Sequence, residues 1–505
     1  MSIVRAGSRQ WIGLGVLSLA CVLYAMDLTV LHLAVPHISA DLHPTSSQLL
    51  WIMDIYGFFV AGSLITMGNL GDRIGRRKLL LIGAITFAIT SALAAFSTTA
   101  EMLIISRALL GVSGATLAPS TLSLIRNMFH DGKQRSIAIG VWVSSFSAGA
   151  AIGPLVGGVL LEYFWWGSVF LLAIPVMMIL LILGPMILPE FRDKKARRLD
   201  PVSAALSLGA ILAIIYGVKQ IAQDGLGLEP VVFFGLGLAI GFAFLLRQKR
   251  IPDPLVDLEL FKIRAFSGSL ITFLLGVFVA FGAFVFISQY LQLVLGLSPL
   301  QAGLWTLPWA LAFVAGSTIT PRLAHRIRPG IIIAVGLVIA GAGLGLLMQI
   351  DTQTSFWLIM TALVVSSLGL APVFTLATDL VVGSAPPERA GAASAISETT
   401  AELGGALGIA ILGSIGTALY RKELAESIPA GIPDDARYTA MDTLAGAVQV
   451  SKSLPSEIGT ILLDAAHQSF LHGLHISIIV GVALTMGAAV LATIILKNVK
   501  ISQAH

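Results

Sequence analysis

Acidic side chains lie in three apolar stretches of this sequence, where a carboxylate is energetically expensive. They are Asp27, Asp54, and the pair Glu398 and Glu402. Translocon scales place an acidic residue at the centre of a lipid-spanning helix at roughly +3 kcal/mol. Glu398 and Glu402 are four residues apart, so a helix presents them on one face. Acids in such surroundings are expected to have a function.

These acids could bind a proton and a cation alternately. Apolar surroundings favour the neutral, protonated carboxyl group, and a second carboxylate on the same face adds to that preference. An organic cation binds the ionised form, because it supplies the missing counter-charge. Proton and cation then compete for one acid, which is sufficient for exchange across a membrane. A structural ion pair, such as one between Asp54 and Arg107, is the simpler alternative.

Basic and aromatic residues in the same stretches could complete a cation site. Arg107 has no charged neighbour in its own apolar stretch, so it must find a carboxylate, carbonyl groups or water. Lipophilic cations also bind aromatic faces. Trp51, Tyr56 and Trp142 are near the acids in sequence or in expected depth, and we predict that they line the substrate cavity.

The composition indicates a membrane protein with many spans. Hydrophobic residues make up 56% of the 505 residues and charged residues 11%, whereas soluble domains carry about 25% charge. The net charge of +4 does not indicate nucleic-acid binding, because the basic residues fall in short clusters between apolar runs. The single cysteine, Cys21, has no partner for a disulfide and is expected to be buried.

Fourteen apolar stretches are long enough to span a bilayer, which takes about 20 residues per helix. They cover about 12–34, 48–68, 79–97, 102–124, 137–160, 168–188, 201–221, 230–246, 266–294, 302–320, 331–349, 356–378, 392–418 and 474–496. With the N-terminus inside, 25 of the 31 Lys and Arg residues fall in the tails and inner loops. The positive-inside rule therefore predicts that both termini and the loop 189–200 are cytoplasmic.

The last outer loop, 421–472, is long for a connection without structure of its own. The stretches "YTAMDTLAGAVQVSKS" and "SEIGTILLDAAHQSF" both show helical spacing of apolar residues. We expect two short amphipathic helices over the outer face, with a loop of no fixed structure as the alternative.

A weak internal repeat relates the two ends of the chain. "GNLGDRIGRRK" (68–78) is similar to "TPRLAHRIRPG" (320–330), and "KQRSIAIG" (133–140) takes the place of "PERAGAAS" (387–394). Secondary transporters build two halves around a midplane site from such repeats. We expect an all-α polytopic fold with a 6+2+6 arrangement of helices. Its parts are a six-helix half at 1–190, two additional helices at 191–265, and a six-helix half at 266–505.

Six motifs follow one another along the chain. They are "DLTVLHLAVP" (27–36), "LWIMDIY" (50–56), "GNLGDRIGRRK" (68–78), "RALLGVSGA" (107–115), "GAAIGPLVGG" (149–158) and "SETTAELGG" (397–405). Together they resemble the major facilitator superfamily, specifically its fourteen-helix drug:proton antiporters of the QacA, SmvA and LfrA type. The resemblance implies a monomeric exporter of lipophilic cations, such as quaternary ammonium antiseptics and dyes, in the bacterial cytoplasmic membrane. It needs no cofactor, because the proton gradient drives it.

The third motif contains a glycine-flanked charge cluster. Its members are Gly71, Asp72, Arg73, Gly75, Arg76 and Arg77. The two glycines permit a tight turn and close helix approach. The aspartate can pair with an arginine or with helix N-terminal amides, and the arginines are expected at the inner membrane surface. The resemblance implies a latch that breaks and re-forms between outward-facing and inward-facing states; positive-inside anchoring is the alternative.

The fifth motif predicts a smooth helix face. Gly149, Gly153 and Gly157 recur every four residues, with Gly158 beside them, so a neighbouring helix can approach closely. Pro154 removes a backbone donor and bends the helix. The resemblance implies a pivot that limits proton leak, and tight packing alone is the alternative.

Two residues depart from the family pattern. His32 stands where the family usually has Asn, and Phe313 stands where some relatives carry an acid linked to divalent cations. Monovalent cations are therefore the expected substrates. An exporter of one specific metabolite or antibiotic stays open, as does a channel or membrane enzyme. The sequence has no P-loop, HExxH or CxxC motif. His472 and His475 are too few to predict a metal site.

Overall fold

The computed structural model describes residues 6–44, 46–192, 200–224, 227–252, 254–353, 355–386, 389–429, 431–497 and 499. All regular structure in these ranges is helical. Thirteen helical segments there are long and apolar enough to cross a membrane. The span predicted at 48–68 corresponds to a further helix, α2, of 29 residues.

The chain begins with a group of eight helices. They are α1 (Ser8–Leu42), α2 (Ser46–Ile74), α3 (Arg76–Ala95), α4 (Ala100–Gly114), α5 (Leu117–Met128), α6 (Gly132–Tyr163), α7 (Ser168–Leu171) and α8 (Ala173–Ile187). Two more follow, α9 (Pro201–Asp224) and α10 (Leu228–Arg250). The span predicted at 102–124 is divided between α4 and α5.

The remaining helices form a second large group. They are η1 (Leu258–Lys262), α11 (Arg264–Gln289), η2 (Tyr290–Val294), α12 (Pro299–Ala324), α13 (Pro329–Leu346), η3 (Leu347–Gln349), α14 (Phe356–Ser384), α15 (Ala390–Ser427), α16 (Asp434–Asp442), α17 (Leu444–Ser453) and α18 (Ser456–Ile495). The element order is consistent with a 6+2+6 arrangement.

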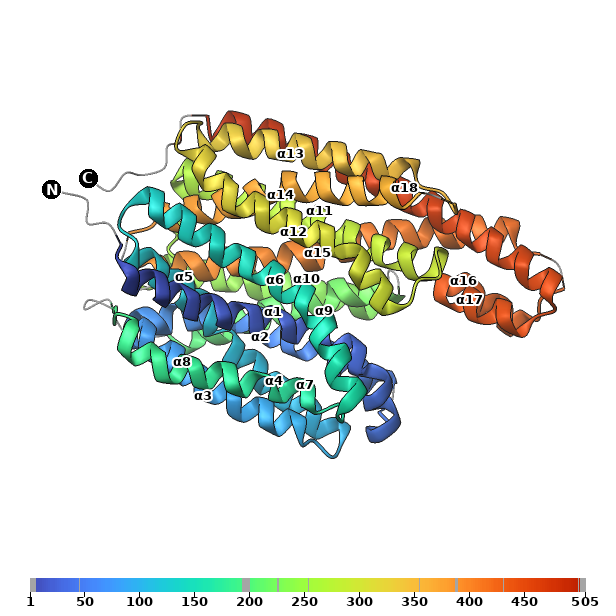
Figure 1. Ribbon diagram of the computed structural model, residues 1–505, viewed down its shortest axis with the longest axis horizontal. Coiled ribbons are helices and arrows are strands. Elements are labelled where there is room, and N and C mark those ends of the chain that lie inside the picture. Colours follow the sequence, from blue (N-terminus) through green and yellow to red (C-terminus); the bar gives the residue numbers. More distant parts are fainter. Residues whose placement is uncertain are drawn as a thin grey trace.

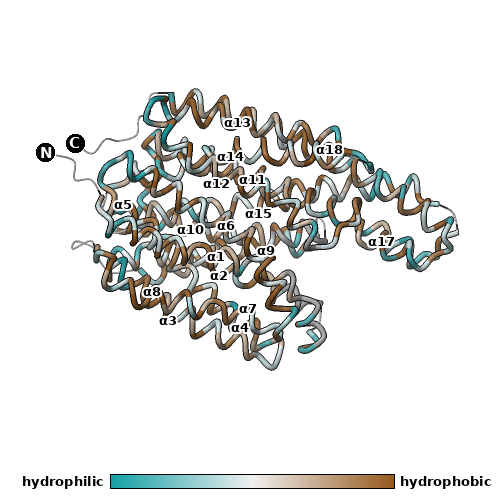
Figure 2. The backbone as a smooth tube through the Cα atoms, in the orientation of Figure 1, coloured by the Kyte–Doolittle hydropathy of each residue, from teal (hydrophilic) through white to brown (hydrophobic). Residues whose placement is uncertain are grey.

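The long helices run side by side along the longest axis of the molecule (Figure 1). The start of α1 and the end of α18 lie at one end of the bundle, which we call the terminal face. The helices α16 and α17 lie at the opposite end. Hydrophobic residues predominate along the middle of the bundle, and hydrophilic residues gather at its two ends (Figure 2). This banding is typical of a bundle whose middle lies in lipid.

Two apolar cores organise the packing. One is formed mainly by α1 to α8, in which α1 packs along α6 and α2 along α4. The other is formed by α11 to α18, in which α11 packs along α15 and α13 along α14. The helices α9 and α10 pack on each other, and α9 also contacts both α2 and α15. The two additional helices therefore touch both groups.

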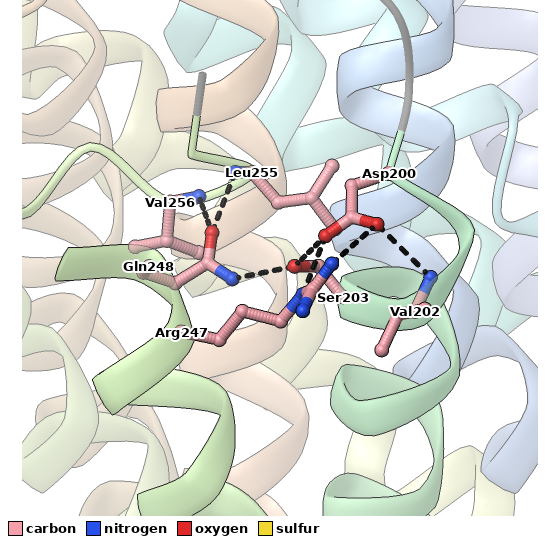
Figure 3. A network of polar contacts seen from close by, with 7 residues as sticks. All are labelled: Asp200, Val202, Ser203, Arg247, Gln248, Leu255 and Val256. Carbon is pink, nitrogen blue, oxygen red and sulfur yellow. Dashed lines mark hydrogen bonds and ion pairs between the residues drawn. The ribbon is translucent and has the colours of Figure 1, made fainter. Parts of the chain in front are cut away.

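A polar network fixes α9 against α10 at the terminal face (Figure 3). Arg247 donates two hydrogen bonds to Asp200, at 2.7 and 3.1 Å, and Ser203 donates a third at 2.7 Å. These bonds hold the pKa of the Asp200 carboxyl well below its usual range. The buried Gln248 donates to Ser203 and accepts from the backbone N–H groups of Leu255 and Val256. The network thus ties the chain after α10 to the start of α9.

The prediction of two separate helices in 421–472 was partly wrong. The first amphipathic stretch forms α16 and α17, which meet at Thr443. The second stretch, starting at Ser456, is the beginning of the 40-residue α18 and continues without a break into the last span. Its apolar residues keep the same helical spacing as those of the span, so nothing in the sequence ends the helix between them.

Candidate functional site

Arg107 lies at the centre of a buried charge pair. Its side chain is 1% exposed. Its Nε atom donates to the Ile52 carbonyl oxygen at 2.7 Å, and an Nη atom lies 3.4 Å from a carboxylate oxygen of Asp27. Of the three kinds of partner expected for Arg107, the structure thus shows two, a carbonyl group of α2 and the carboxylate of Asp27 on α1. The suggested pair with Asp54 is not tested, because the Asp54 side chain lies outside the described residues.

One tyrosine lies against this pair, and a second tyrosine lies behind the first. The guanidinium of Arg107 lies 5.2 Å from the centre of the Tyr56 ring, within cation–π range. Tyr56 is fully buried and faces Tyr24 across 6.2 Å. Gly114 leaves room for the Tyr56 hydroxyl, because a Cβ atom there would lie 3.0 Å from it. The helices α1, α2 and α4 therefore each contribute one part of the same site.

Acids of the second helix group reach the same tyrosines. Glu398 and Glu402 are half-buried on α15. Tyr24 is within electrostatic reach of both glutamates, and Tyr56 is within reach of Asp27, Arg107 and Glu402. The structure thus joins Asp27, Arg107 and Tyr56 in direct contact and places the α15 glutamates within electrostatic reach of the two tyrosines.

The other two predicted aromatic residues have different surroundings. Trp142 is 3% exposed, donates to the Thr121 hydroxyl at 2.9 Å and packs edge-on against Phe146. Trp51 stacks almost parallel on Tyr216 of α9, with ring centres 6.0 Å apart. Of the three aromatic residues, only Tyr56 directly contacts the Arg107 pair in the interactions described here.

The glycine face of α6 lies directly against the helix that carries Asp27. A side chain at Gly149 would overlap the backbone of Val22, and one at Gly153 would overlap the Thr29 hydroxyl. A Cβ atom at Gly157 would lie 2.9 Å from Val30. These contacts flank Asp27 on α1, so the motif fixes the position of that acid. Around Gly158 there is open space instead, and the Pro154 side chain lies outside the described residues.

Arg76 of the third motif is buried within the protein, with 0% of its surface exposed. It donates to Asp72 at 2.8 Å, so of the two partners considered for that aspartate the structure shows an arginine. Its guanidinium packs against Gly391 at the start of α15, where any side chain would overlap it. The cluster therefore joins the two helix groups at the terminal face.

The other members of the cluster have the expected surface or turn positions. Arg73 is exposed, and Arg77 lies 3.7 Å from Glu190. Gly75 connects α2 to α3 with φ of 112°, a conformation that favours glycine. A Cβ atom at Gly71 would lie 2.5 Å from the Arg76 guanidinium. Both glycines are therefore needed for the compact turn.

A further buried ion pair, which was not predicted from the sequence, joins the first helix group to the second. Asp379 of α14 is 2% exposed and lies 3.1 Å from Arg135 of α6. Ser136 donates to the other oxygen of the same carboxylate. Arg126 of α5 donates to the Ala385 carbonyl oxygen nearby, at 2.9 Å. Asp379 directly follows the predicted span 356–378. An acid at the end of an apolar span was the sequence feature that could have indicated this ion pair.

The described residues contain no group of three or more His, Cys, Asp or Glu side chains that could hold a metal ion. His472 lies 3.7 Å from Glu423 of α15. His475 bonds to the Ile350 carbonyl oxygen at 3.0 Å. The two histidines thus have separate protein partners.

Comparisons with known proteins agree on one family. The model of the Major Facilitator Superfamily matches residues 17–409. The chain is 43% identical over 488 residues to the multidrug efflux pump LfrA of Mycolicibacterium smegmatis, covering 97% of this chain and 96% of the relative. It is 34% identical over 464 residues to the methyl viologen resistance protein SmvA of Salmonella typhimurium, covering 92% and 93%.

A third relative and a solved structure extend this picture. The tetracenomycin C resistance and export protein of Streptomyces glaucescens is 32% identical, covering 96% of this chain and 91% of the relative. The crystal structure of the human organic anion transporter MFSD10 has a TM-score of 0.61 at 16% identity, covering 94% of this chain and 98% of that one. At this identity the structural likeness concerns the fold alone.

Proposed function

Because the chain belongs to the Major Facilitator Superfamily, whose members are transporters and not enzymes, we propose that it exports lipophilic cationic drugs in exchange for protons. The observation that carries this proposal is the buried cluster of Asp27, Arg107 and Tyr56, with Glu402 of the second helix group beside it. Relatives named for multidrug efflux and for resistance to methyl viologen support the export of cationic compounds.

Each residue of the cluster has a distinct part in the proposed exchange. Arg107 holds Asp27 in place and lowers the cost of its charge in an apolar bundle. The half-buried Glu398 and Glu402 are four residues apart on one face, so like-charge repulsion favours keeping one of them protonated. An incoming organic cation relieves that repulsion and releases the proton. The buried aromatic faces of Tyr24 and Tyr56 offer a cation–π surface close to these acids.

Alternating access would be controlled at the terminal face. There Arg76 packs on Gly391, and Arg135 pairs with Asp379, so both contacts join the first helix group to the second. We propose that these contacts close the terminal face when the opposite end is open. They must break before a cation can enter from the terminal side.

The membrane orientation forms part of the proposal. We propose that the terminal face is cytoplasmic in a bacterial inner membrane and that α16 and α17 are outside, on the basis of the Lys and Arg distribution. A cysteine at the exposed Ser453 of α17, in a Cys21→Ala background, should react with an impermeant thiol reagent in intact cells. If a well-expressed protein reacts only after cell lysis, the orientation is reversed.

A second candidate function is the export of one specific antibiotic. Relatives named for tetracenomycin C and for puromycin resistance favour it. Such a transporter would give resistance to one chemical class, whereas the proposed exporter would act on several structurally unrelated cations.

Dye efflux from cells tests the proposed function. Cells with the gene should expel ethidium and a quaternary ammonium dye faster than cells without it. A protonophore should abolish the difference. Export of a neutral antibiotic, with no effect on either dye, would favour the second candidate. Efflux that persists after the proton gradient collapses would contradict proton coupling.

A further inference from the structure

A groove of about 410 Å³ lies at the terminal face, between the start of α11 and the end of α18. Its polar end carries Lys262 and Arg264, and Ser267 lies beside them. Its apolar wall includes Ile271 and Ile494, whose side chains are 43% and 68% exposed. Basic and apolar side chains thus follow one another from the end of the bundle towards its middle.

Close packing of the two helices forms the floor of the groove. A Cβ atom at Gly268 would lie 2.5 Å from Ile495, so α11 and α18 are in direct contact there. The neighbouring start of α13 adds a further cation, because Arg328 donates to the Lys497 carbonyl oxygen at 3.4 Å. Lys497 itself is exposed at the end of α18. Arg328 and Lys497 therefore add two basic residues to this end of the bundle, beside the two that line the groove.

One acid is close to these bases. Glu259 lies 2.7 Å from Lys262, but the two side chains are 72% and 73% exposed. Exposed ion pairs of this kind contribute little, so a stronger anion can replace the glutamate as the partner of Lys262.

We propose that this groove binds an anionic phospholipid, with its phosphate at Lys262 and Arg264 and an acyl chain along Ile271 and Ile494. Basic pockets between membrane helices at a bilayer surface suit lipid headgroups. The bases lie at the start of α11 and Ile271 lies about two turns further into the bundle, which matches the order of phosphate and acyl chain in a leaflet. A free phosphate ion would use the bases but not the apolar wall.

Native mass spectrometry of the purified full chain tests this site. The protein is exchanged into detergent with equal amounts of phosphatidylglycerol and phosphatidylcholine, and retained lipid is counted. The wild type should retain phosphatidylglycerol preferentially. The Lys262→Gln/Arg264→Gln variant should bind it about 30-fold more weakly, at about 1 kcal/mol per basic residue. The matched control is Lys249→Gln/Arg250→Gln, two exposed bases in the last turn of α10, which should behave as wild type.

A second variant separates a lipid from a free phosphate. Ile494→Asn keeps both bases but makes the apolar wall more polar. It should therefore weaken the retention of phosphatidylglycerol, and inorganic phosphate should displace the bound lipid as it does in the wild type. Equal retention by the wild type and the Lys262→Gln/Arg264→Gln variant would overturn the proposal. An Ile494→Asn variant that retains lipid as the wild type does, with phosphate displacing it fully, would assign the groove to a phosphate ion and would also overturn it.

Discussion

Two of the buried arginine–aspartate pairs in this molecule have opposite surroundings. Arg107 and Asp27 both belong to the first helix group and are enclosed by aromatic rings, with acids of α15 nearby. Arg135 and Asp379 belong to different groups and meet at the terminal face. A pair within one group can persist while the groups move, whereas a pair between groups must break. The first therefore suits a binding role and the second a gating role.

Breaking the first pair should have the largest effect. Asp27→Asn keeps the side-chain size but removes the charge, so the site can no longer alternate between a proton and a cation. Transport should therefore fall about 100-fold or more, which corresponds to about 3 kcal/mol in the barrier to transport. Dye transport by purified protein in proteoliposomes measures this effect.

A matched control distinguishes this loss from general damage. Asp200→Asn also removes an acid from an arginine pair, but at the terminal face and partly exposed. It should transport almost as well as the wild type. If both variants lose transport equally, Asp27 has no special role in exchange. Glu398→Gln should be severely impaired as well, and Glu402→Gln more mildly.

Moving α1 should disturb the same pair indirectly. Gly149→Ala places a methyl group against the Val22 backbone, and overpacking of this kind costs about 1–3 kcal/mol. We expect transport to fall about tenfold, because Asp27 shifts relative to Arg107. Gly158→Ala, on the same motif but in open space, should have no effect. Equal transport by the two variants would show that this contact does not position Asp27.

Breaking the second pair should alter access more than binding. Asp379→Asn removes the negative charge that pairs with Arg135 and leaves only one acceptor oxygen for Arg135 and Ser136, so the terminal face should open more often. In a Cys21→Ala background, a Ser317→Cys reporter should then become more reactive, because Ser317 is fully buried where α12 meets α6. Cation affinity should stay within about threefold of the wild type, a change of less than 1 kcal/mol.

The milder Ser136→Ala variant provides a check on folding. It removes one hydrogen bond, worth about 1 kcal/mol, and leaves the ion pair in place. The thiol reactivity of the Ser317→Cys reporter in this variant should lie between its reactivity in the wild type and in Asp379→Asn. Unchanged reactivity in both variants, with cation affinity lost in Asp379→Asn, would reverse the roles assigned to the two pairs.

The smallest effect is expected at Asp200. Hydrogen bonds from Arg247 lower the pKa of Asp200, so its contribution is fully present above the unfolded pKa of about 3.9 and is lost only as the pH falls below it. Asp200→Asn should therefore lower the Tm slightly, and by the same amount at pH 8 and pH 5. If the Tm difference between the wild type and Asp200→Asn were present at pH 8 and absent at pH 5, the Asp200 carboxyl would titrate between these pH values, which would contradict this prediction.

Long apolar runs allowed most of the fold to be predicted from the sequence. Span positions follow from hydropathy because every backbone group in lipid must be bonded within a helix. The breaks within spans were less visible, since α4 and α5 separate at Ala115 and Thr116, which are compatible with a continuous helix. The continuity of α18 was missed for the opposite reason, because its amphipathic first part and the apolar span share one helical period.

The site was predictable in its residue types but not in its pairings. A buried Arg107 must find an acid, but only the packing of α1 beside α4 and α2 selects Asp27. Charge counting shows that Arg76 is basic, but only the helix contact at Gly391 shows that it is buried between helices. Trp51 faces α9, and nothing in the local sequence determines which side of α2 meets the additional helices. Each of these depends on contacts between distant segments.

Transport in proteoliposomes under a defined gradient tests the central claim most directly. Exchange of one proton for one monovalent cation moves no net charge, so a membrane potential, worth about 2.3 kcal/mol per charge per 100 mV, contributes nothing to it. We expect a pH gradient without a potential to drive dye accumulation in the wild type and to fail in Asp27→Asn. Accumulation driven by a potential alone, or accumulation by Asp27→Asn at the wild-type rate, would contradict the account.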